Sequence, residues 1–118
     1  SPSAAQGYNC LTITSPQTGA TMTARPTVTG RVCQPDARVW VVVKETNYSR
    51  CWVQPEARVN PVTGAWTADI YIGYANTPPG EPFRMIAFGD RQNAFTGGET
   101  PCWPTLSLES PPVDVTKI

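Results

Sequence analysis

The chain consists of short apolar segments separated by turns, a pattern typical of β-strands. Residues 65–72 alternate most regularly, with Trp66, Ala68, Ile70 and Ile72 on one face and more polar residues between them. A period of two indicates a strand with one buried face. Residues 39–43 are apolar at every position. This continuous run predicts a central strand that is covered on both faces.

The same pattern predicts about seven strands in all. They cover residues 10–14, 27–33, 38–44, 51–54 (with a continuation at 56–59), 65–72, 83–89 and 113–118. Thirteen prolines and nine glycines separate these segments and leave no room for a long helix. Short strands divided by turn residues predict an all-β fold, an antiparallel β-sandwich. We therefore expect one domain at residues 10–118, preceded by an N-terminal extension at residues 1–9.

Residues 90–112 do not fit the strand pattern. They are rich in glycine and proline and contain Cys102 and Trp103. Loops of this length are usually functional or anchored to the rest of the fold. We expect Cys102 to be the anchor.

Four cysteines and no histidine distinguish the composition. The cysteines are Cys10, Cys33, Cys51 and Cys102, and an even count in a short, turn-rich chain indicates disulfides and an oxidising compartment. No Cys-x-x-Cys pair is present, so the spacing does not favour a zinc site. The chain opens on small polar residues, as a mature secreted chain would. We expect a secreted, extracellular or cell-surface protein; the alternative is a cytosolic protein with four thiols.

Four cysteines allow three pairings. Cys10 and Cys33 lie at similar distances from a predicted turn near residue 20, so they can meet if the first two strands are neighbours. Cys51 would then pair with Cys102. The competing arrangement joins Cys33 to Cys51 and Cys10 to Cys102.

The order of these features resembles bacterial Ig-like domains of secreted and surface proteins. The resemblance is carried by Ile13-Thr14-Ser15-Pro16 with Gly19, Val28-Thr29-Gly30, residues 39–43, Trp52-Val53-Gln54, Gly64-Ala65-Trp66 and Pro82-Phe83. It covers roughly residues 11–90 and 113–118. The resemblance implies an Ig-like, immunoglobulin-type sandwich and says almost nothing about function, since such sandwiches serve many roles. The four cysteines and residues 90–112 depart from the family pattern.

Composition also argues against several functions. Without histidine there is no Ser-His or Cys-His dyad, and the carboxylates form no local motif. We expect no catalytic residue, no metal site and no cofactor. The net charge of zero does not favour a nucleic-acid partner. No apolar run approaches the roughly 20 residues of a membrane helix, so we do not expect the chain to span a membrane.

Aromatic residues are the best candidates for ligand binding. Trp40 and Trp66 lie in apolar strands and are expected in the core, whereas Trp103 and Tyr48 lie in loops and are better placed to stack on a sugar. Asn47 begins an Asn-Tyr-Ser sequon in a predicted surface loop and is a candidate for glycosylation.

These observations favour a non-enzymatic structural or adhesive module at a cell surface. Its expected partners are further copies of itself, in a homo-oligomer, filament or layer, or other surface proteins and glycans. Residues 1–9 could add a strand to the open sheet edge of a neighbouring copy. The alternative is a carbohydrate- or protein-binding accessory module of a secreted protein. A third interpretation is a disulfide-stabilised inhibitor or toxin-like effector that uses residues 90–112.

Overall fold

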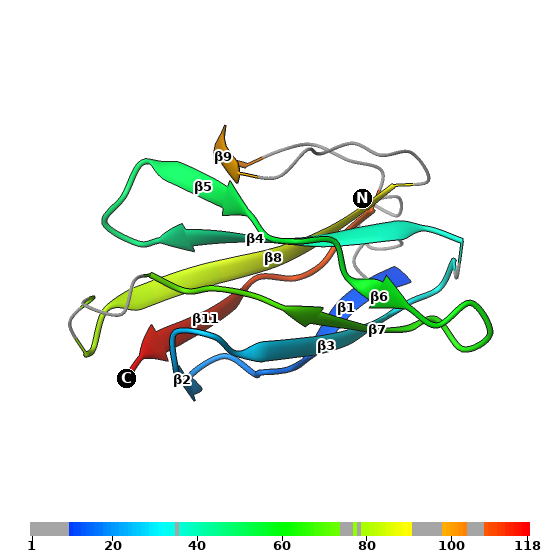
Figure 1. Ribbon diagram of the computed structural model, residues 1–118, viewed down its shortest axis with the longest axis horizontal. Helices are drawn as coiled ribbons and strands as arrows, with labels where there is room; N and C mark the ends of the chain where they lie inside the picture. Colours follow the sequence, from blue (N-terminus) through cyan, green and yellow to red (C-terminus); the bar gives the residue numbers. More distant parts are fainter. Residues whose placement is uncertain (1–9, 35, 74–76, 78, 91–97, 104–107) are drawn as a thin grey trace.

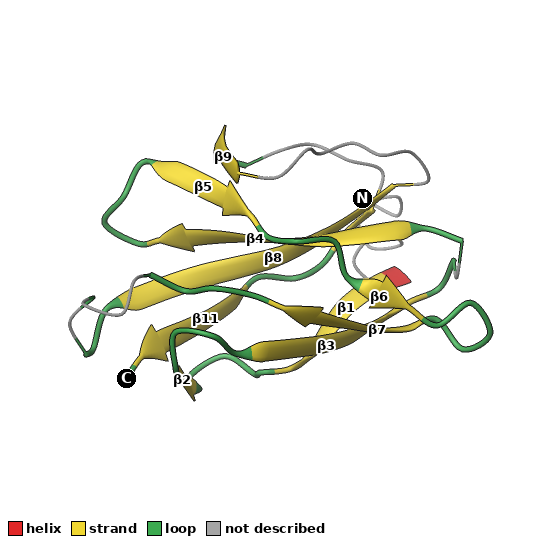
Figure 2. Cartoon of the chain, in the orientation of Figure 1, coloured by secondary structure: helices red, strands yellow, loops and turns green. Residues whose placement is uncertain are grey.

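Strands arranged in two sheets make up the described structure (Figure 1). The computed structural model describes residues 10–34, 36–73, 77, 79–90, 98–103 and 108–118; within it, the side chains of residues 98–101 are not described. None of these residues belongs to a helix long and apolar enough to cross a lipid bilayer. The strands in the described residues are β1 (Leu11–Ser15), β2 (Thr21–Met22), β3 (Thr27–Val32), β4 (Arg38–Glu45), β5 (Arg50–Val53), β6 (Arg58–Val59), β7 (Ala65–Asp69), β8 (Pro82–Asp90), β9 (Gly98–Pro101), β10 (Leu108–Glu109) and β11 (Val113–Lys117) (Figure 2).

The two sheets differ in width. The smaller has the order β1-β3-β7-β6, and the larger has the order β2-β11-β8-β4-β5-β9, with β10 paired to β8. All pairings are antiparallel except that of β2 with β11, which is parallel. The all-β prediction is confirmed. The described residues contain eleven strands, where the sequence predicts about seven; β2, β6, β9 and β10 are the additional ones.

The main core lies between the two sheets. Leu11, Val28 and Trp66 come from the smaller sheet and pack with residues such as Val41 and Met85 of the larger one. The alternation predicted for residues 65–72 is confirmed, since Trp66 and the three apolar residues that follow it on that face are all buried. Burying such alternating faces against each other is the main stabilising term of a two-sheet fold.

A second apolar cluster covers the outer face of the larger sheet. It contains Trp40, Val42, Cys51, Val53, Ile86 and Phe88, with Cys102 and Trp103 packed against it. The strand at residues 39–43 is therefore covered on both faces, as its continuous apolar sequence predicts. Trp40 is in the outer cluster and Trp66 in the main core, so both predicted core tryptophans are buried.

The disulfides join Cys10 to Cys33 and Cys51 to Cys102. The favoured pairing is confirmed and the competing one is wrong. Strands β1 and β3 are neighbours, and the Cys33 amide donates a hydrogen bond to the Cys10 carbonyl over 2.8 Å. Cys102 anchors part of the 90–112 segment to β5, and β9 within that segment adds a strand to the edge of the larger sheet.

Two predicted strands end differently in the structure. The strand expected at 65–72 ends at Asp69, because Ile70 and Ile72 donate instead to the carbonyls of Pro26 and Ala24. The predicted continuation at 56–59 stays bonded to β4 only as far as Ala57, whose amide donates to the Val39 carbonyl. The chain then crosses to the smaller sheet, where β6 pairs with β7, so the prediction is wrong for its last two residues.

The last strand also differs at its end. Lys117, and not Ile118, follows Val113 and Val115 on the buried face. The Lys117 ammonium donates to the carbonyls of Thr77 and Ile118 over 3.2 and 3.4 Å. Satisfying the charge with backbone oxygens allows the long aliphatic stem to be buried, while Ile118 is exposed.

Candidate functional site

The unequal widths of the sheets leave part of the larger one uncovered. Strands β6 and β7, at one edge of the smaller sheet, pack against β4, whereas β5 lies one strand further out. Cys51 and Val53 of β5 face the outer cluster, so Trp52 and Gln54 point toward the inner side. The inner face of β5, with the 39% exposed Trp52, therefore overhangs the smaller sheet.

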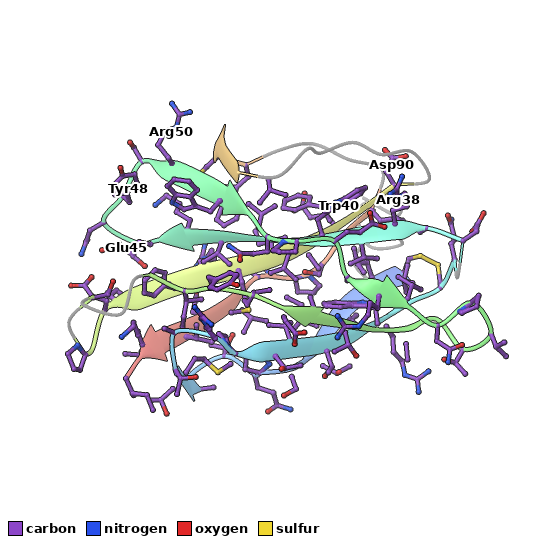
Figure 3. The ribbon with its side chains drawn as sticks, viewed as in Figure 1. Arg38, Trp40, Glu45, Tyr48, Arg50 and Asp90 are labelled. Atoms are coloured by element: carbon purple, nitrogen blue, oxygen red, sulfur yellow. A yellow bond between two sulfur atoms is a disulfide. The ribbon has the colours of Figure 1, made fainter. Side chains whose placement is uncertain are left out.

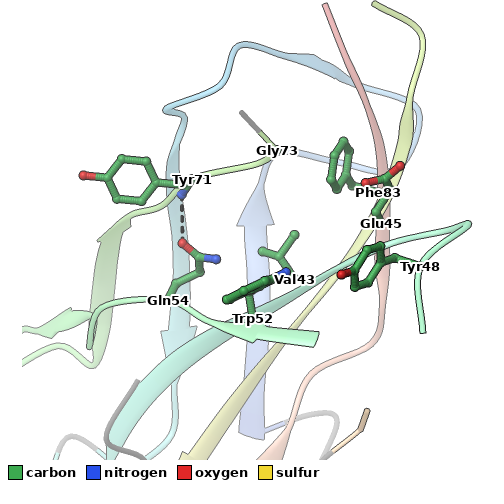
Figure 4. A pocket seen from close by; sticks show the side chains of 8 residues that line it. All are labelled: Val43, Glu45, Tyr48, Trp52, Gln54, Tyr71, Gly73 and Phe83. Carbon is green, nitrogen blue, oxygen red and sulfur yellow. Dashed lines mark hydrogen bonds between the residues drawn. The ribbon is translucent and has the colours of Figure 1, made fainter. Parts of the chain in front are cut away.

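A pocket of about 330 Å³ occupies this overhang (Figure 4). It is lined by Val43, Glu45, Tyr48, Trp52, Gln54, Tyr71, Gly73 and Phe83. We call it the aromatic groove. Val43 and Phe83 are buried members of the main core and form its apolar floor. Tyr48, Trp52 and Tyr71 are 50%, 39% and 51% exposed and form its walls.

The backbone on both sides of Tyr71 is held in place. Ile70 and Ile72 donate hydrogen bonds to the Pro26 and Ala24 carbonyls over 3.1 and 2.9 Å. The amide of Tyr71 points the other way and donates to Oε1 of Gln54 over 2.8 Å. This bond ties the segment after β7 to the end of β5, so two segments distant in sequence form one wall.

A tight turn positions Tyr48 between β4 and β5. The Tyr48 amide donates to the Glu45 carbonyl over 2.9 Å, and the Thr46 amide donates to the Pro82 carbonyl over 3.0 Å. Figure 3 shows Tyr48 and Glu45 at one end of the larger sheet, far from Arg38 and Asp90 at the other. Asn47, the predicted glycosylation residue, is exposed in this same turn.

Gln54 is the buried polar residue of the groove. It is 6% exposed, and its side-chain oxygen is used by Tyr71. Its side-chain nitrogen bonds to no other described residue and points into the groove beside Trp52 and Val43 (Figure 4). This nitrogen is not fully buried, since the buried and unpartnered side-chain atoms of the described residues are Trp66 Nε1 and Glu81 Oε2. Water in the groove can reach it, and a ligand oxygen that replaced such a water would accept its hydrogen bond.

Gly73 shapes the end of the groove. Its φ of 65° lies in the left-handed region that favours glycine. A Cβ at this position would lie 2.6 Å from Oγ1 of Thr77 and 3.2 Å from the ring of Phe83. A larger residue would therefore push into the floor of the groove.

Two carboxyl groups meet at the groove. Glu45 lines it, and Glu81 lies against Glu45. Burial and a hydrogen bond to the Glu81 carboxyl raise the pKa of Glu45 above its ordinary value of 4.5. Oε2 of Glu81 is buried and has no hydrogen-bond partner among the described residues. Within the same residues, no ion pair involves either carboxylate.

A second pocket of about 460 Å³ lies beyond the edge of the outer cluster. Trp103 lines it together with Lys44, Arg84 and Asp114, among others. The Trp103 ring is half-buried, with its centroid 6.5 Å from that of Phe88. The two aromatic residues predicted to bind ligand, Tyr48 and Trp103, therefore lie in different pockets.

The sequence alone does not single out the residues that complete the aromatic groove with Tyr48. Gln54, Tyr71 and Glu45 come from three separate segments, and only the sheet geometry brings them together. A signal for Gln54 was present, since it is a polar residue at the inward position that follows Trp52 in the alternation of β5. Residues 1–9 lie outside the described residues, as do residues 91–97 and 104–107 of the 90–112 segment. Among the described residues, no group of three potential ligands could hold a metal ion.

The chain matches no protein-family model, and neither the curated proteins nor the solved structures show a significant similarity to it.

Proposed function

We propose that this protein is an extracellular Ig-like module that binds carbohydrate in the aromatic groove. The observation that carries the proposal is the convergence of three half-exposed aromatic rings on an apolar floor that also holds the free amide nitrogen of Gln54. A sugar ring has an apolar face that can stack on an aromatic ring, and hydroxyls that need donors and acceptors. The groove supplies both kinds of contact. An adhesive role at a surface fits a module of this kind.

The strand order supports the Ig-like assignment. An immunoglobulin sandwich places strands A, B, E and D in one sheet and C, F and G in the other. In this chain β1, β3, β7 and β6 take the first set of places, and β4, β8 and β11 take the second. Strand β5 then corresponds to the additional strand beside C that variable-type domains carry.

Two disulfides support an extracellular location, because such bonds persist in oxidising compartments. They also allow a small domain to keep part of a sheet uncovered, since each cross-link stabilises the fold independently of apolar burial. Exposed aromatic residues on a stable framework are the usual composition of a binding surface.

The proposal is tested by titrating a panel of soluble glycans into the protein and following tryptophan fluorescence, since Trp52 lies in the groove. We expect a saturable change with at least one glycan and about tenfold weaker binding in Trp52→Ala, which corresponds to about 1.4 kcal/mol. Val62→Ala is the matched control, because Val62 is 86% exposed in a turn outside the groove. If no glycan binds, or if Trp52→Ala and Tyr48→Ala bind as tightly as the unaltered chain, the proposal is wrong.

Self-assembly stays a separate prediction. It depends on residues 1–9, which lie outside the described residues, and on a free sheet edge to accept them. Light scattering on the full chain and on the chain without residues 1–9 tests it. We expect large particles only for the full chain, and a monomer in both cases would contradict a filament or layer.

A further inference from the structure

Among the residues that the structure describes, no ion pair joins the carboxyl group of Glu45 or Glu81 to a lysine or arginine. Four basic side chains are engaged by other groups: Lys44 donates to the carbonyls of Glu45 and Thr46, and Lys117 donates to those of Thr77 and Ile118. The Arg84 guanidinium forms two hydrogen bonds to the Asp114 carboxylate, and Arg25 lies 5.2 Å above the ring centroid of Tyr71. Two adjacent carboxylates without a counter-ion repel each other, so one must keep a proton or a cation must be supplied from outside.

The aromatic groove contains the kinds of side chain that bind such a cation. Glu45 shares it with Tyr48 and Trp52, whose ring faces attract positive charge. Tyr71, on the same wall, already carries the guanidinium of Arg25 over its ring. A carboxylate beside aromatic rings is the combination that binds an ammonium group.

A second observation points to a ligand that is more than a cation. The side-chain nitrogen of Gln54, in a side chain more than nine-tenths buried, points into the groove with no partner among the described residues. It can donate only to an oxygen, such as a hydroxyl. The half-exposed Trp52 ring offers a flat apolar surface for a ring of similar size. A lysine side chain would bring the ammonium but neither the hydroxyl nor the ring.

We propose that the groove selects glycans whose sugars carry a free amino group, with the ammonium at Glu45, a hydroxyl at Gln54 and the sugar ring against Trp52. This inference rests on the proposed function and names its ligand class. A volume of about 330 Å³ is at the small end of ligand pockets, which span about 300–1,000 Å³, and suits a short segment of such a glycan.

The test uses three hexasaccharides that share one linkage and differ in one substituent: glucosamine with a free amine, N-acetylglucosamine, and glucose. Calorimetric titration of the full chain at mildly acidic pH, where the amine is protonated, measures the three affinities. We expect the glucosamine hexamer to bind at least about tenfold more tightly than the other two, the size of effect expected when a hydrogen bond to a charged group is gained.

Variants identify the residue responsible. Glu45→Gln removes the charge but keeps the shape of the side chain, and it is expected to abolish the preference for the glucosamine hexamer over the other two. Glu81→Gln is a second variant and is expected to weaken the preference, which keeps the test informative if Glu45→Gln folds poorly. Glu56→Gln is the matched control, because Glu56 pairs with Arg38 outside the groove and its loss should leave the preference intact.

The outcomes separate the two proposals. Equal affinities for the three hexamers would overturn the amino-sugar inference and leave carbohydrate binding standing. No binding by any hexamer or by the glycan panel would overturn both. If a lysine hexamer binds more tightly than the glucosamine hexamer and Glu45→Gln abolishes that binding, the groove recognises a cationic peptide and the inference is wrong.

Discussion

The inner and outer faces of the larger sheet are each partly buried, but they are covered in different ways. The smaller sheet covers the inner face except at the overhang of β5, and it contributes Leu11, Val28 and Trp66 to the main core. The outer face is covered by a short irregular stretch with Cys102 and Trp103, attached through the disulfide to Cys51. The inner cover is a hydrogen-bonded sheet of four strands, whereas the described part of the outer cover is a few residues fixed by a disulfide. We therefore expect the outer cover to depend more strongly on its covalent anchor.

The outer cover also has a clear limit. Along β4 the outward residues change from Trp40 and Val42 to Lys44, and along β8 they change from Phe88 and Ile86 to Arg84. The apolar half lies under the cover, and the charged half lies beside it. The change from apolar to charged outward residues along β4 and β8 therefore marks where the cover ends.

Removing one tryptophan from each apolar cluster should give the largest losses of folding stability. The two losses compare how rigidly the inner and outer faces of the larger sheet are covered. Trp66→Ala is expected to lower the free energy of unfolding by about 3–5 kcal/mol, because a rigid two-sheet core cannot collapse around the cavity. Trp40→Ala should cost about 3 kcal/mol, near the low end of that range, since the outer cover can settle inward. Urea denaturation measures both. Equal losses would show that the cover is as rigid as the main core.

Removing each disulfide tests the role of the anchor. Replacing Cys51 and Cys102 by alanine, or Cys10 and Cys33, should cost about 2–4 kcal/mol in each case. Loss of the Cys51–Cys102 disulfide should cost more stability than loss of Cys10–Cys33, because it joins residues 51 positions apart and the other joins residues 23 apart. Hydrogen exchange should then show lost protection in β5 for the first double variant and in β1 for the second. Full protection of the β5 amides after removal of the Cys51–Cys102 disulfide would contradict its role as the anchor of the outer cover.

The smallest effect is expected at the charged half of the outer face. The Arg84 guanidinium donates to both carboxylate oxygens of Asp114 over 2.7 and 3.1 Å, and this pairing lowers the pKa of Asp114 below its ordinary value of 3.8. A lowered pKa stabilises the fold at pH values above 3.8, and this stability is lost as the pH falls through the lowered value. Asp114→Asn should therefore cost at most about 1 kcal/mol at neutral pH, since the pair is half-exposed, and nothing in strong acid.

The stability that Glu45 contributes should depend on pH in the opposite direction to that of Asp114. Glu45 is therefore the internal comparison for the Asp114→Asn experiment. Its raised pKa means that the folded chain binds the proton more tightly than the unfolded chain. The unaltered protein should gain stability from this group as the pH falls through the raised pKa to the ordinary value of 4.5, and Glu45→Gln should remove that gain. Unfolding curves over a pH series distinguish the two groups, and parallel pH profiles for both variants would contradict the assignment.

Most of the fold could be predicted from local patterns. The alternation around Trp66 and the continuous apolar run at 39–43 each indicate burial through neighbours in sequence, and the structure agrees. The Cys10–Cys33 pairing followed from two strands joined by one turn. In each case, the information lies within a few residues or within one hairpin-like unit.

The groove could not be predicted in the same way. Tyr48 was singled out as exposed, but its neighbours Trp52, Gln54 and Tyr71 meet only because one sheet is wider than the other. Sheet width depends on which strands pair at the edges, and short edge strands such as β6 leave almost no sequence signal. Trp103 was expected to be exposed in a loop and is half-buried against Phe88, because the disulfide at Cys102 holds it over the sheet.

The overhang of β5 has a consequence for how readily this protein can change. Tyr48, Trp52 and Tyr71 form the walls of the groove without filling the core, so replacing them should leave the framework intact. They lie on three short segments that can vary independently of one another. New ligand preferences could then arise by single substitutions that cost little folding stability. A wide sheet facing a narrow one thus gives a small domain a surface on which specificity can evolve separately from the fold.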